Sequence, residues 1–389
     1  MERADVVLLG ETHDDRIAHL LQLQLLRGAQ QRFSRTDRPV ALSLEMFERD
    51  VQGIMDEYLS GAITERDLKQ DCRPWPNYDT DYRPLVELAK SEGLPVICAN
   101  APRRYVSMAG RHGRASLETL PAASLKHLPP LPYLQPSQAY LEKTNRTMQA
   151  AAEQMQDLRS EQRRVDSSQE PATEGQSENC FPDVSAQESV AGPPEEGQHQ
   201  CMETYEPQVQ TSGRTIESPP QGQVARQGCP YIGFTASTNF MDAQTLWDAS
   251  MAYSIAEHLD SSSRKTELCA LHGSGANLQT PVGLEERINA ASSSEATCDR
   301  AAARTSTSGR PLVLHVCGKF HAEGGMGIPE HLEAYREGLR ILIVAFLPTS
   351  RDVDISTCEF LEEDLDQYGD FVILTDLHSP RSYTVEHPV

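Results

Sequence analysis

Carboxylate and imidazole side chains stand directly after apolar runs in two G-x-x-H motifs. The first motif spans 10–13, after the apolar run 6–9, and the second spans 318–321, after the run 311–317. Another carboxylate follows the run 40–44. Two carboxylates at one site could act as a general acid and a general base, because like charges push their pKa values apart. Histidines could bind a metal ion or transfer protons. The candidate catalytic residues are Glu11, His13, Glu45 and His321, and the two histidines are also the candidate metal ligands.

Two arginines follow another apolar run. Arg103 and Arg104 come shortly after the run 95–99 and could clamp an anionic group of a ligand. Simpler interpretations stay open: the arginines could be a solvated pair, and Glu45 could cap the following helix. One histidine after a strand is more often structural than functional. The recurrence of G-x-x-H after two buried runs favours a polar site, because packing alone does not require the same spacing twice.

These residues depend on an alternation of strands and helices for their positions. Short runs rich in branched apolar residues predict strands, and apolar residues at helical spacing, such as Ile17, Leu20, Leu21 and Leu25, predict helices between them. The predicted strands are 6–10, 40–44, 95–99, 311–318, 339–347 and 370–375, and the predicted helices are 14–32, 50–60, 64–71, 80–92, 137–164 and 236–259.

Such alternation is typical of an α/β fold with a mostly parallel sheet flanked by helices. Ligands of open parallel sheets bind outside the carboxyl ends of the strands. Because both G-x-x-H motifs, Glu45 and the two arginines follow predicted strands, we expect one polar site at that edge of the sheet.

The predicted domain spans 5–376 and is interrupted twice. Residues 165–230 are rich in Gln, Glu, Ser and Pro and nearly lack long apolar side chains, and residues 261–310 are rich in Ser, Ala and Thr. Such segments bury too little apolar surface to offset the entropy lost on ordering. We therefore expect a long disordered acidic insertion at 165–230 and a low-complexity loop at 261–310.

Charge and cysteine content narrow the functional classes. The formal net charge of −22 argues against binding to nucleic acid, because phosphate contacts require Lys and Arg. No apolar run approaches the roughly 20 residues of a transmembrane helix. The nine cysteines include no C-x-x-C pair, which favours a reducing compartment. We therefore expect a cytoplasmic or organellar protein that is not secreted.

Six segments in order resemble the ChaN-like haem-binding family of the EreA/ChaN-like superfamily. They are LLGETHDD, SLEMF, YRPL, PVICANAPRR, AQTLWDASMA and GKFHAEGGMGIPEHL, and the match covers 5–120 and 231–376. The resemblance implies haem binding or iron homeostasis, with haem held by a tyrosine near the interface of a homodimer. Tyr78 and Tyr82 are the candidates. Haem would be non-covalent, because C-x-x-C-H is absent. Chloroplast members of the family make a chloroplast location plausible.

The same superfamily also contains hydrolases. The Gly-Glu-x-His element resembles erythromycin esterases, and Tiki-type and TraB-type proteins use two G-x-x-H motifs and a Glu, in some cases with a divalent metal ion. By that resemblance, Glu11, His13, Glu45 and His321 would form the reactive set of an ester or amide hydrolase. Three hypotheses therefore stay open: a haem-binding or iron-homeostasis protein, a hydrolase, and a protein that binds a small molecule at an idle ancestral site.

Overall fold

The computed structural model describes residues 1–36, 38–167, 239–273, 310–350, 365 and 367–382. The chain divides into two compact units, of which the first comprises 1–150 and 227–388 and the second comprises 151–226 and Val389. All strands and the candidate site belong to the first unit. Most of the predicted insertion and of the predicted low-complexity loop lies outside the described residues.

Six strands form one parallel sheet in the order β3-β2-β4-β1-β5-β6. The strands are β1 Val6–Glu11, β2 Val40–Glu48, β3 Val96–Asn100, β4 Leu312–Gly318, β5 Ile341–Thr349 and β6 Phe371–Asp376. All six predicted strands are confirmed, and so is the parallel α/β fold. Strands β1 and β4, which carry the two motifs, are neighbours at the centre of the sheet.

Helices connect the strands. They are α1 Arg16–Phe33, α2 Gln52–Ser60, α3 Glu65–Asp71, α4 Arg83–Glu92, α5 Arg103–His112, α6 Ala122–Leu125, α7 Gln138–Ser167, α8 Phe240–Gly273 and α9 Ile328–Tyr335. A π-helical turn, Tyr78–Tyr82, precedes α4, and 3-10 turns follow β2, α5 and β4. Within the described residues, no helix is long and apolar enough to cross a membrane.

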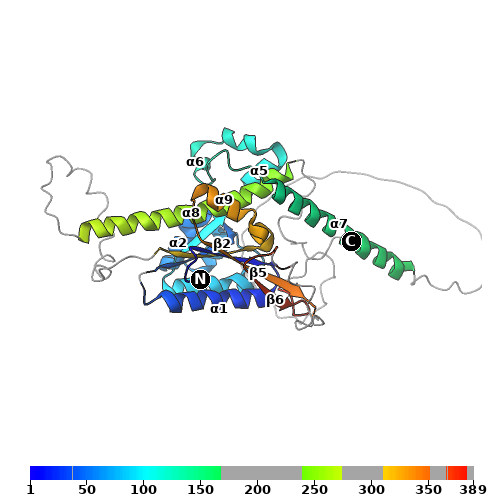
Figure 1. Ribbon diagram of the computed structural model, residues 1–389, viewed down its shortest axis with the longest axis horizontal. Helices are drawn as coiled ribbons and strands as arrows, with labels where there is room; N and C mark the ends of the chain where they lie inside the picture. Colours follow the sequence, from blue (N-terminus) through cyan, green and yellow to red (C-terminus); the bar gives the residue numbers. More distant parts are fainter. Residues whose placement is uncertain (37, 168–238, 274–309, 351–364, 366, 383–389) are drawn as a thin grey trace, which may run out of the picture. The chain divides into compact units, whose positions relative to one another are not determined.

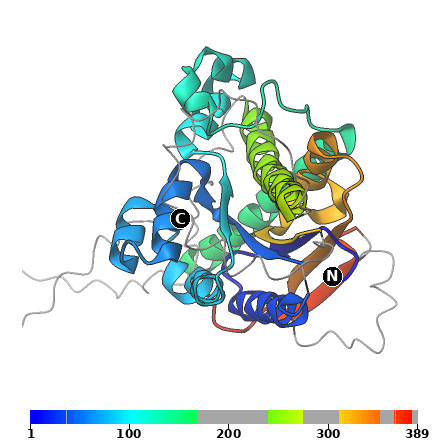
Figure 2. The same ribbon diagram turned by 90° about the vertical axis from the view of Figure 1, so that its left-hand side faces the viewer.

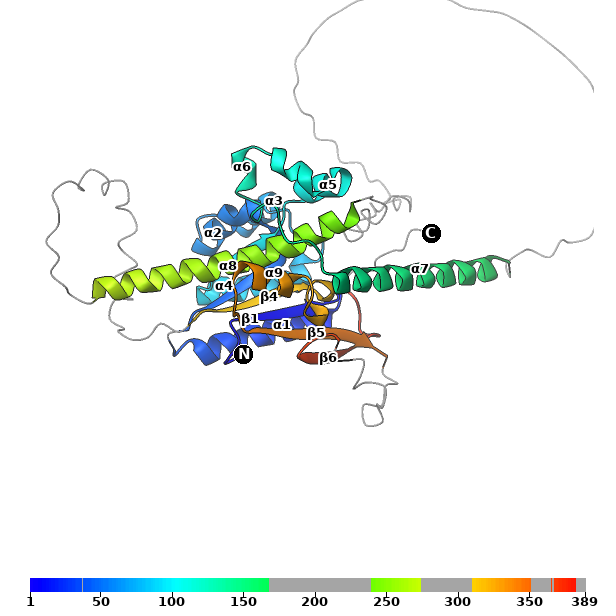
Figure 3. The same cartoon turned by 45° about the horizontal axis from the view of Figure 1, so that its top comes forward.

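The sheet is covered on both faces. Helix α1 lies on one side of the strands and α8 with α9 on the other, as Figure 1 and the turned view in Figure 2 show. In Figure 3, α5 and α6 lie next to α8. Side chains of β1 alternate between two cores: Val7 and Leu9 pack with α1 and α4, whereas Val6 and Leu8 pack with α5, α8 and α9. This double burial explains the uninterrupted apolar run of the strand.

Local signals fix several helix ends. The Asp15 side chain accepts hydrogen bonds from the backbone N–H groups of Ile17 and Ala18, at 3.0 and 3.2 Å, and so caps α1 beside the first motif. Thr64 and Asp67 form a reciprocal capping box at the start of α3. Gly93 ends α4 with a φ of +67°, a conformation that costs glycine little.

Three boundaries and one helix face differ from the sequence-based expectation. Residues 261–273 continue α8 instead of forming a loop, because no glycine or proline interrupts them before Gly273. Helix α7 runs to Ser167, past the predicted start of the insertion. Strand β2 continues to Glu48 and therefore includes Glu45. The buried side of α1 carries Ala18, His19, Gln22 and Leu26, whereas Leu20 is 58% exposed.

Candidate functional site

The two G-x-x-H motifs meet at the carboxyl ends of β1 and β4. Glu11 pairs with Gly318 in the parallel register of these strands. A Cβ atom on Gly10 would lie 2.9 Å from Cα of Lys319, and one on Gly318 would lie 2.9 Å from both Cε1 and Nε2 of His13. Real Cβ atoms do not approach other atoms so closely. The two glycines therefore allow the motifs to touch.

Glu11 is buried and surrounded by hydrogen-bond donors. Its Oε1 atom lies 2.5 Å from the Tyr82 hydroxyl, which donates to it, and 3.1 Å from Nδ1 of His13. Its Oε2 atom accepts from Nε2 of Gln22 at 2.6 Å and lies 3.2 Å from Nδ1 of His19. Both oxygens of this carboxylate therefore contact protein groups, and one of these contacts orients the His13 ring.

A buried ion pair balances the charge of Glu11. Burial alone would raise the pKa of Glu11, but the His19 charge and the hydrogen bonds from His13 and His19 hold it below its usual range. Burial would lower the pKa of His19, but the charge and hydrogen bond of Glu11, with Asp81 nearby, raise it to about 9. His19 is thus a cation at neutral pH, and Glu11 is its counter-ion.

His13 is held at three points and reaches solvent. Its Nδ1 atom faces Glu11, and its backbone carbonyl accepts from Nδ2 of Asn77 at 2.9 Å and lies 3.1 Å from Nε2 of His19. Its ring meets the Trp75 ring edge-on, with centroids 4.8 Å apart. The side chain is 22% exposed. Among the residues that the structure describes, Nε2 of His13 makes no hydrogen bond, so it is the nitrogen that can meet a ligand.

His321 of the second motif is bound more tightly by the protein. Its Nδ1 atom lies 2.6 Å from Oδ1 of Asp248 on α8 and 3.3 Å from Nε2 of Gln244. Its Nε2 atom lies 3.7 Å from Oε1 of Glu45. Burial would lower the pKa of His321, but the charges of Glu45 and Asp248 and the Asp248 hydrogen bond raise it. The other Glu45 oxygen accepts from the backbone N–H of Gly318 at 2.7 Å. Glu45 therefore binds the second motif and does not cap a helix.

The four candidate catalytic residues thus lie within one cluster, but their chemical roles stay predictions. Among the described residues, no group of three or more His, Cys, Asp or Glu side chains is arranged to hold a metal ion. The predicted divalent ion at His13 and His321 likewise stays a prediction.

The two arginines lie in an ion-pair cluster after β2 and β3. Nε of Arg103 is 3.2 Å from Oε1 of Glu48, and Nη1 of Arg104 is 2.5 Å from Oδ2 of Asp50. Arg73 also contacts both acids, at 3.0 and 2.7 Å. The side chain of Arg103 is 43% exposed and that of Arg104 is 49% exposed, so both face solvent in part.

Both candidate tyrosines are buried. Tyr82 is fully buried and donates to Glu11. Tyr78 is 2% exposed and packs edge-on against Phe47, and its hydroxyl has no hydrogen-bond partner among the described residues. Burial raises the pKa of Tyr78. Contact between either phenol and a bound ligand would require the surrounding core to move.

Sequence reasoning missed the groups that hold the histidines. His19, Gln22, Asp81 and Asp248 are all buried and bind the site from helices or turns. One signal was present: Asp248 lies in a helix whose apolar residues include Met251 and Ile255, at the spacing of its buried side. A carboxylate on a buried helix face needs a partner, because an unpaired buried charge is costly.

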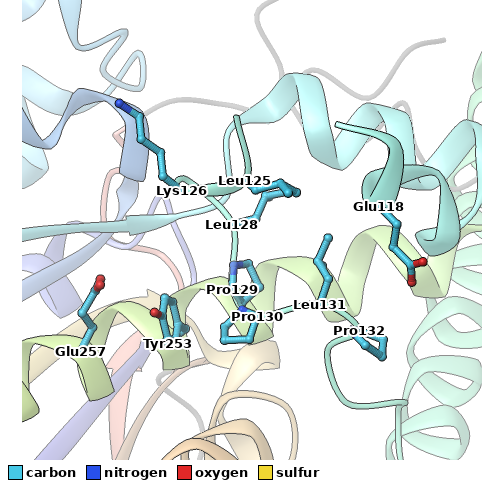
Figure 4. Close-up of a pocket in the computed structure, with 10 residues that line it drawn as sticks. All are labelled: Glu118, Leu125, Lys126, Leu128, Pro129, Pro130, Leu131, Pro132, Tyr253 and Glu257. Atoms are coloured by element: carbon cyan, nitrogen blue, oxygen red, sulfur yellow. The ribbon is translucent and has the colours of Figure 1, made fainter. Parts of the chain in front are cut away.

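A separate pocket of about 660 Å³ lies between α6 with its following loop and α8 (Figure 4). Leucine and proline side chains form much of its wall, and the close-up shows Tyr253 beside Pro129 and Pro130. Its lining residues are Glu118, Leu125, Lys126, Leu128, Pro129, Pro130, Leu131, Pro132, Tyr253 and Glu257. None of the predicted site residues contributes to this lining.

Fold and site together define a parallel α/β protein with paired G-x-x-H motifs at one sheet edge. A family model described as "Haem-binding uptake, Tiki superfamily, ChaN" matches residues 1–276. The chain belongs to this family, and the predicted resemblance is confirmed. No comparison supports the hydrolase alternative.

Two individual proteins are similar to the chain over different extents. The protein RETICULATA-RELATED 5, chloroplastic, of Arabidopsis thaliana is 30% identical over 109 residues, which are 26% of this chain and 14% of that protein. The chain therefore spans a small part of that relative. A structure titled "Cofacial heme binding to ChaN of Campylobacter jejuni" is 12% identical with a TM-score of 0.43, and the match covers 90% of this chain and 84% of that one.

Proposed function

We propose that this protein binds haem non-covalently and that Nε2 of His13 is the iron ligand. The proposal rests on the different surroundings of the two ring nitrogens of His13. Nδ1 faces the buried Glu11 carboxylate at 3.1 Å, whereas Nε2 lies on a side chain that is 22% exposed and is left for a ligand.

This arrangement suits a histidine that binds iron. Histidines that ligate metals usually donate their other ring N–H to a carboxylate or carbonyl, which fixes the tautomer and makes the ligating nitrogen more basic. Histidine is also a common axial ligand of haem iron. Bound haem would supply a redox-active iron centre. The chain's own contribution is to bind, orient and partly shield it, with the Trp75 ring packed against His13.

The other predicted residues take supporting roles in this proposal. Arg103 and Arg104 are half-exposed cations that could exchange their partners Glu48 and Asp50 for the carboxylates of haem. Tyr82 donates to Glu11 and so helps to orient His13.

The test is a haemin titration of the full chain, followed by the shift of the Soret band. Wild type is expected to form a one-to-one complex. His13→Ala should weaken binding by at least about tenfold through loss of the iron ligand. His112→Ala, at an exposed position in α5, is the matched control and should bind as wild type does.

Tyr253→Phe separates this site from the pocket lined by Leu and Pro side chains. Its spectrum should equal that of wild type, because Tyr253 lines that pocket and not the motif site. A Soret shift that survives in His13→Ala but is lost in Tyr253→Phe would place haem in the pocket and refute the proposed ligand.

We also propose an organellar location, supported by the relative named as chloroplastic. Expression of the complete reading frame as a fluorescent fusion in plant cells tests it. Fluorescence confined to chloroplasts is the expected result, and a diffuse cytoplasmic signal would contradict the proposal.

A further inference from the structure

Two buried carboxylates in the ion-pair cluster are bridged by one arginine. Glu48 ends β2 and Asp50 lies two residues later, and their side chains are only 10% and 11% exposed. One oxygen of each acid accepts a hydrogen bond from Nη2 of Arg73: Oε2 of Glu48 at 3.0 Å and Oδ1 of Asp50 at 2.7 Å. The other oxygen of each acid faces an arginine that follows β3.

The two arginines after β3 each contact only one of these acids. Arg103 forms an ion pair with Oε1 of Glu48, but its Nε atom has no hydrogen-bond partner among the described residues. Arg104 donates from Nη1 to Oδ2 of Asp50 at 2.5 Å. Each acid therefore gives one oxygen to Arg73 and the other to an arginine that can be released.

Both acids need a cation because they are buried. A buried carboxylate that loses its partner keeps an uncompensated charge, which is costly. Arg49 lies between Glu48 and Asp50 in the chain, but its guanidinium donates to side chains of α8, among them Glu257 at 3.0 Å. Arg73 is therefore placed to stay with both acids when a ligand takes the two arginines after β3.

The backbone at Arg73 is strained. Its φ of +54° lies in the left-handed region and is the only positive φ of a non-glycine residue in the part of the chain that the structure describes. Pro74 follows, and the residue before a proline prefers an extended conformation. Strain of this kind persists where surrounding contacts hold it, and the two hydrogen bonds to the acids do so here. Trp75 of the same segment packs against His13, so the segment joins the acids to the first motif.

We propose that Arg73 is a positioning residue: as the permanent counter-ion of Glu48 and Asp50, it leaves Arg103 and Arg104 free to bind the carboxylates of the ligand. This inference rests on the proposed function, under which the ligand is haem. Each acid gives up one arginine contact and keeps the other, so ligand binding leaves neither buried acid without a cation. Arg73 acts through the acids and does not touch the ligand.

The first experiment compares haemin with haemin dimethyl ester, whose carboxylates are blocked, in Soret titrations of the full chain. Arg73→Gln should weaken haemin binding by about tenfold. Hydrogen bonds to charged groups are worth roughly 10- to 100-fold, and the 46% exposure of Arg73 places it at the lower end. The affinity for the dimethyl ester should stay unchanged, because the ester has no carboxylate for the released arginines. A disturbed segment around Trp75 would instead weaken both ligands equally.

Two further variants separate the guanidinium from other effects of the substitution. Arg73→Gly relieves the backbone strain, so a purely backbone role predicts unchanged or tighter haemin binding, whereas the proposal predicts the same loss as for Arg73→Gln. Arg340→Gln is the matched control, because Arg340 is 53% exposed and pairs with the buried Asp5 at the amino ends of the strands. It should leave both affinities unchanged.

Removing the two acids should remove the need for Arg73. A Glu48→Gln, Asp50→Asn background lacks the charges that Arg73 neutralises and that compete with the ligand for the other arginines. Haemin should bind this double variant at least as tightly as wild type. Adding Arg73→Gln should then have no further effect, which a role of Arg73 in packing alone does not predict.

The outcomes separate the two proposals. If Arg73→Gln weakens haemin and the dimethyl ester equally, or weakens neither, the counter-ion role is overturned while haem binding stands. Haemin binding by Arg73→Gly at wild-type affinity, or a full loss when Arg73→Gln is added to the acid-free background, overturns it as well. A wild-type chain that takes up neither haemin nor its ester overturns the proposed function together with this inference.

Discussion

The buried pair of Glu11 and His19 should make the stability of the haem-free protein fall in mild alkali. His19 has its pKa raised from 6.5 to about 9 by Glu11, against the opposing effect of burial. A raised pKa means that the folded state binds the proton more tightly than the unfolded chain does. The stabilisation is therefore complete below pH 6.5 and is lost as the pH rises through about 9.

The size of this effect follows from the same shift. Each pKa unit corresponds to about 1.4 kcal/mol, so a rise from 6.5 to about 9 contributes about 3 kcal/mol to the free energy of unfolding. His19 is almost completely buried, at 4% exposure, so solvent screens the pair only weakly. A loss of this size is a large part of the total stability of an ordinary domain.

Urea unfolding at a series of pH values from roughly 6 to 10, the window in which the proton linkage acts, measures the effect. His19→Gln keeps a polar side chain without a titrating charge, and its stability should be nearly independent of pH over this window. The difference in free energy of unfolding between wild type and variant should shrink by about 3 kcal/mol as the pH rises through this window. His112→Gln, at an exposed site, should follow wild type. A wild-type stability that stays level from pH 6.5 to 9 would refute the assignment of His19 as the counter-ion of Glu11.

Three further outcomes are expected. Gly318→Ala places a Cβ atom 2.9 Å from His13 Nε2, so it should weaken haemin binding at least about tenfold in a Soret titration. Gly28→Ala is the control and should not weaken haemin binding, because the space around its Cβ atom is open. Leu44→Ala, at a fully buried position in β2, should lower the free energy of unfolding by about 2–5 kcal/mol in urea. Thr64→Ala should cost about 1 kcal/mol by the same assay, because it removes the capping box of α3.

The strands were readable from the sequence because burial on both faces leaves a strong local pattern. The run 6–9 contains only Val and Leu, and each of its side chains is buried in one of the two cores. The buried face of α1 could not be predicted from the sequence in the same way. Its leucines include the exposed Leu20, whereas His19 and Gln22 point inward to Glu11. Polar side chains on an inward face reverse the usual hydrophobic pattern.

For a related reason, the sequence predicted the strand-end residues of the candidate site but not their partners. Glu11, His13, Glu45 and His321 follow strands, and parallel strands bring such residues together at one edge. Their partners come from helices whose packing no local pattern specifies. Asp248 lies 73 residues before His321 in the chain. Nothing near either residue indicates the pairing, which arises only when α8 packs on the sheet.

The unequal origin of the two carboxylate partners has a chemical consequence. His13 takes its partner Glu11 from its own motif, and Glu11 also pairs with the buried His19. His321 takes Asp248 from α8 and also faces Glu45, so it lies between two buried carboxylates. Identical G-x-x-H spacing therefore produces one ring with a 22% exposed side chain and one with a 10% exposed side chain. Under the proposed function, a ligand reaches His13 with less movement of the protein than His321, because the groups that hold His321 come from helix α8 and strand β2 and close around its ring.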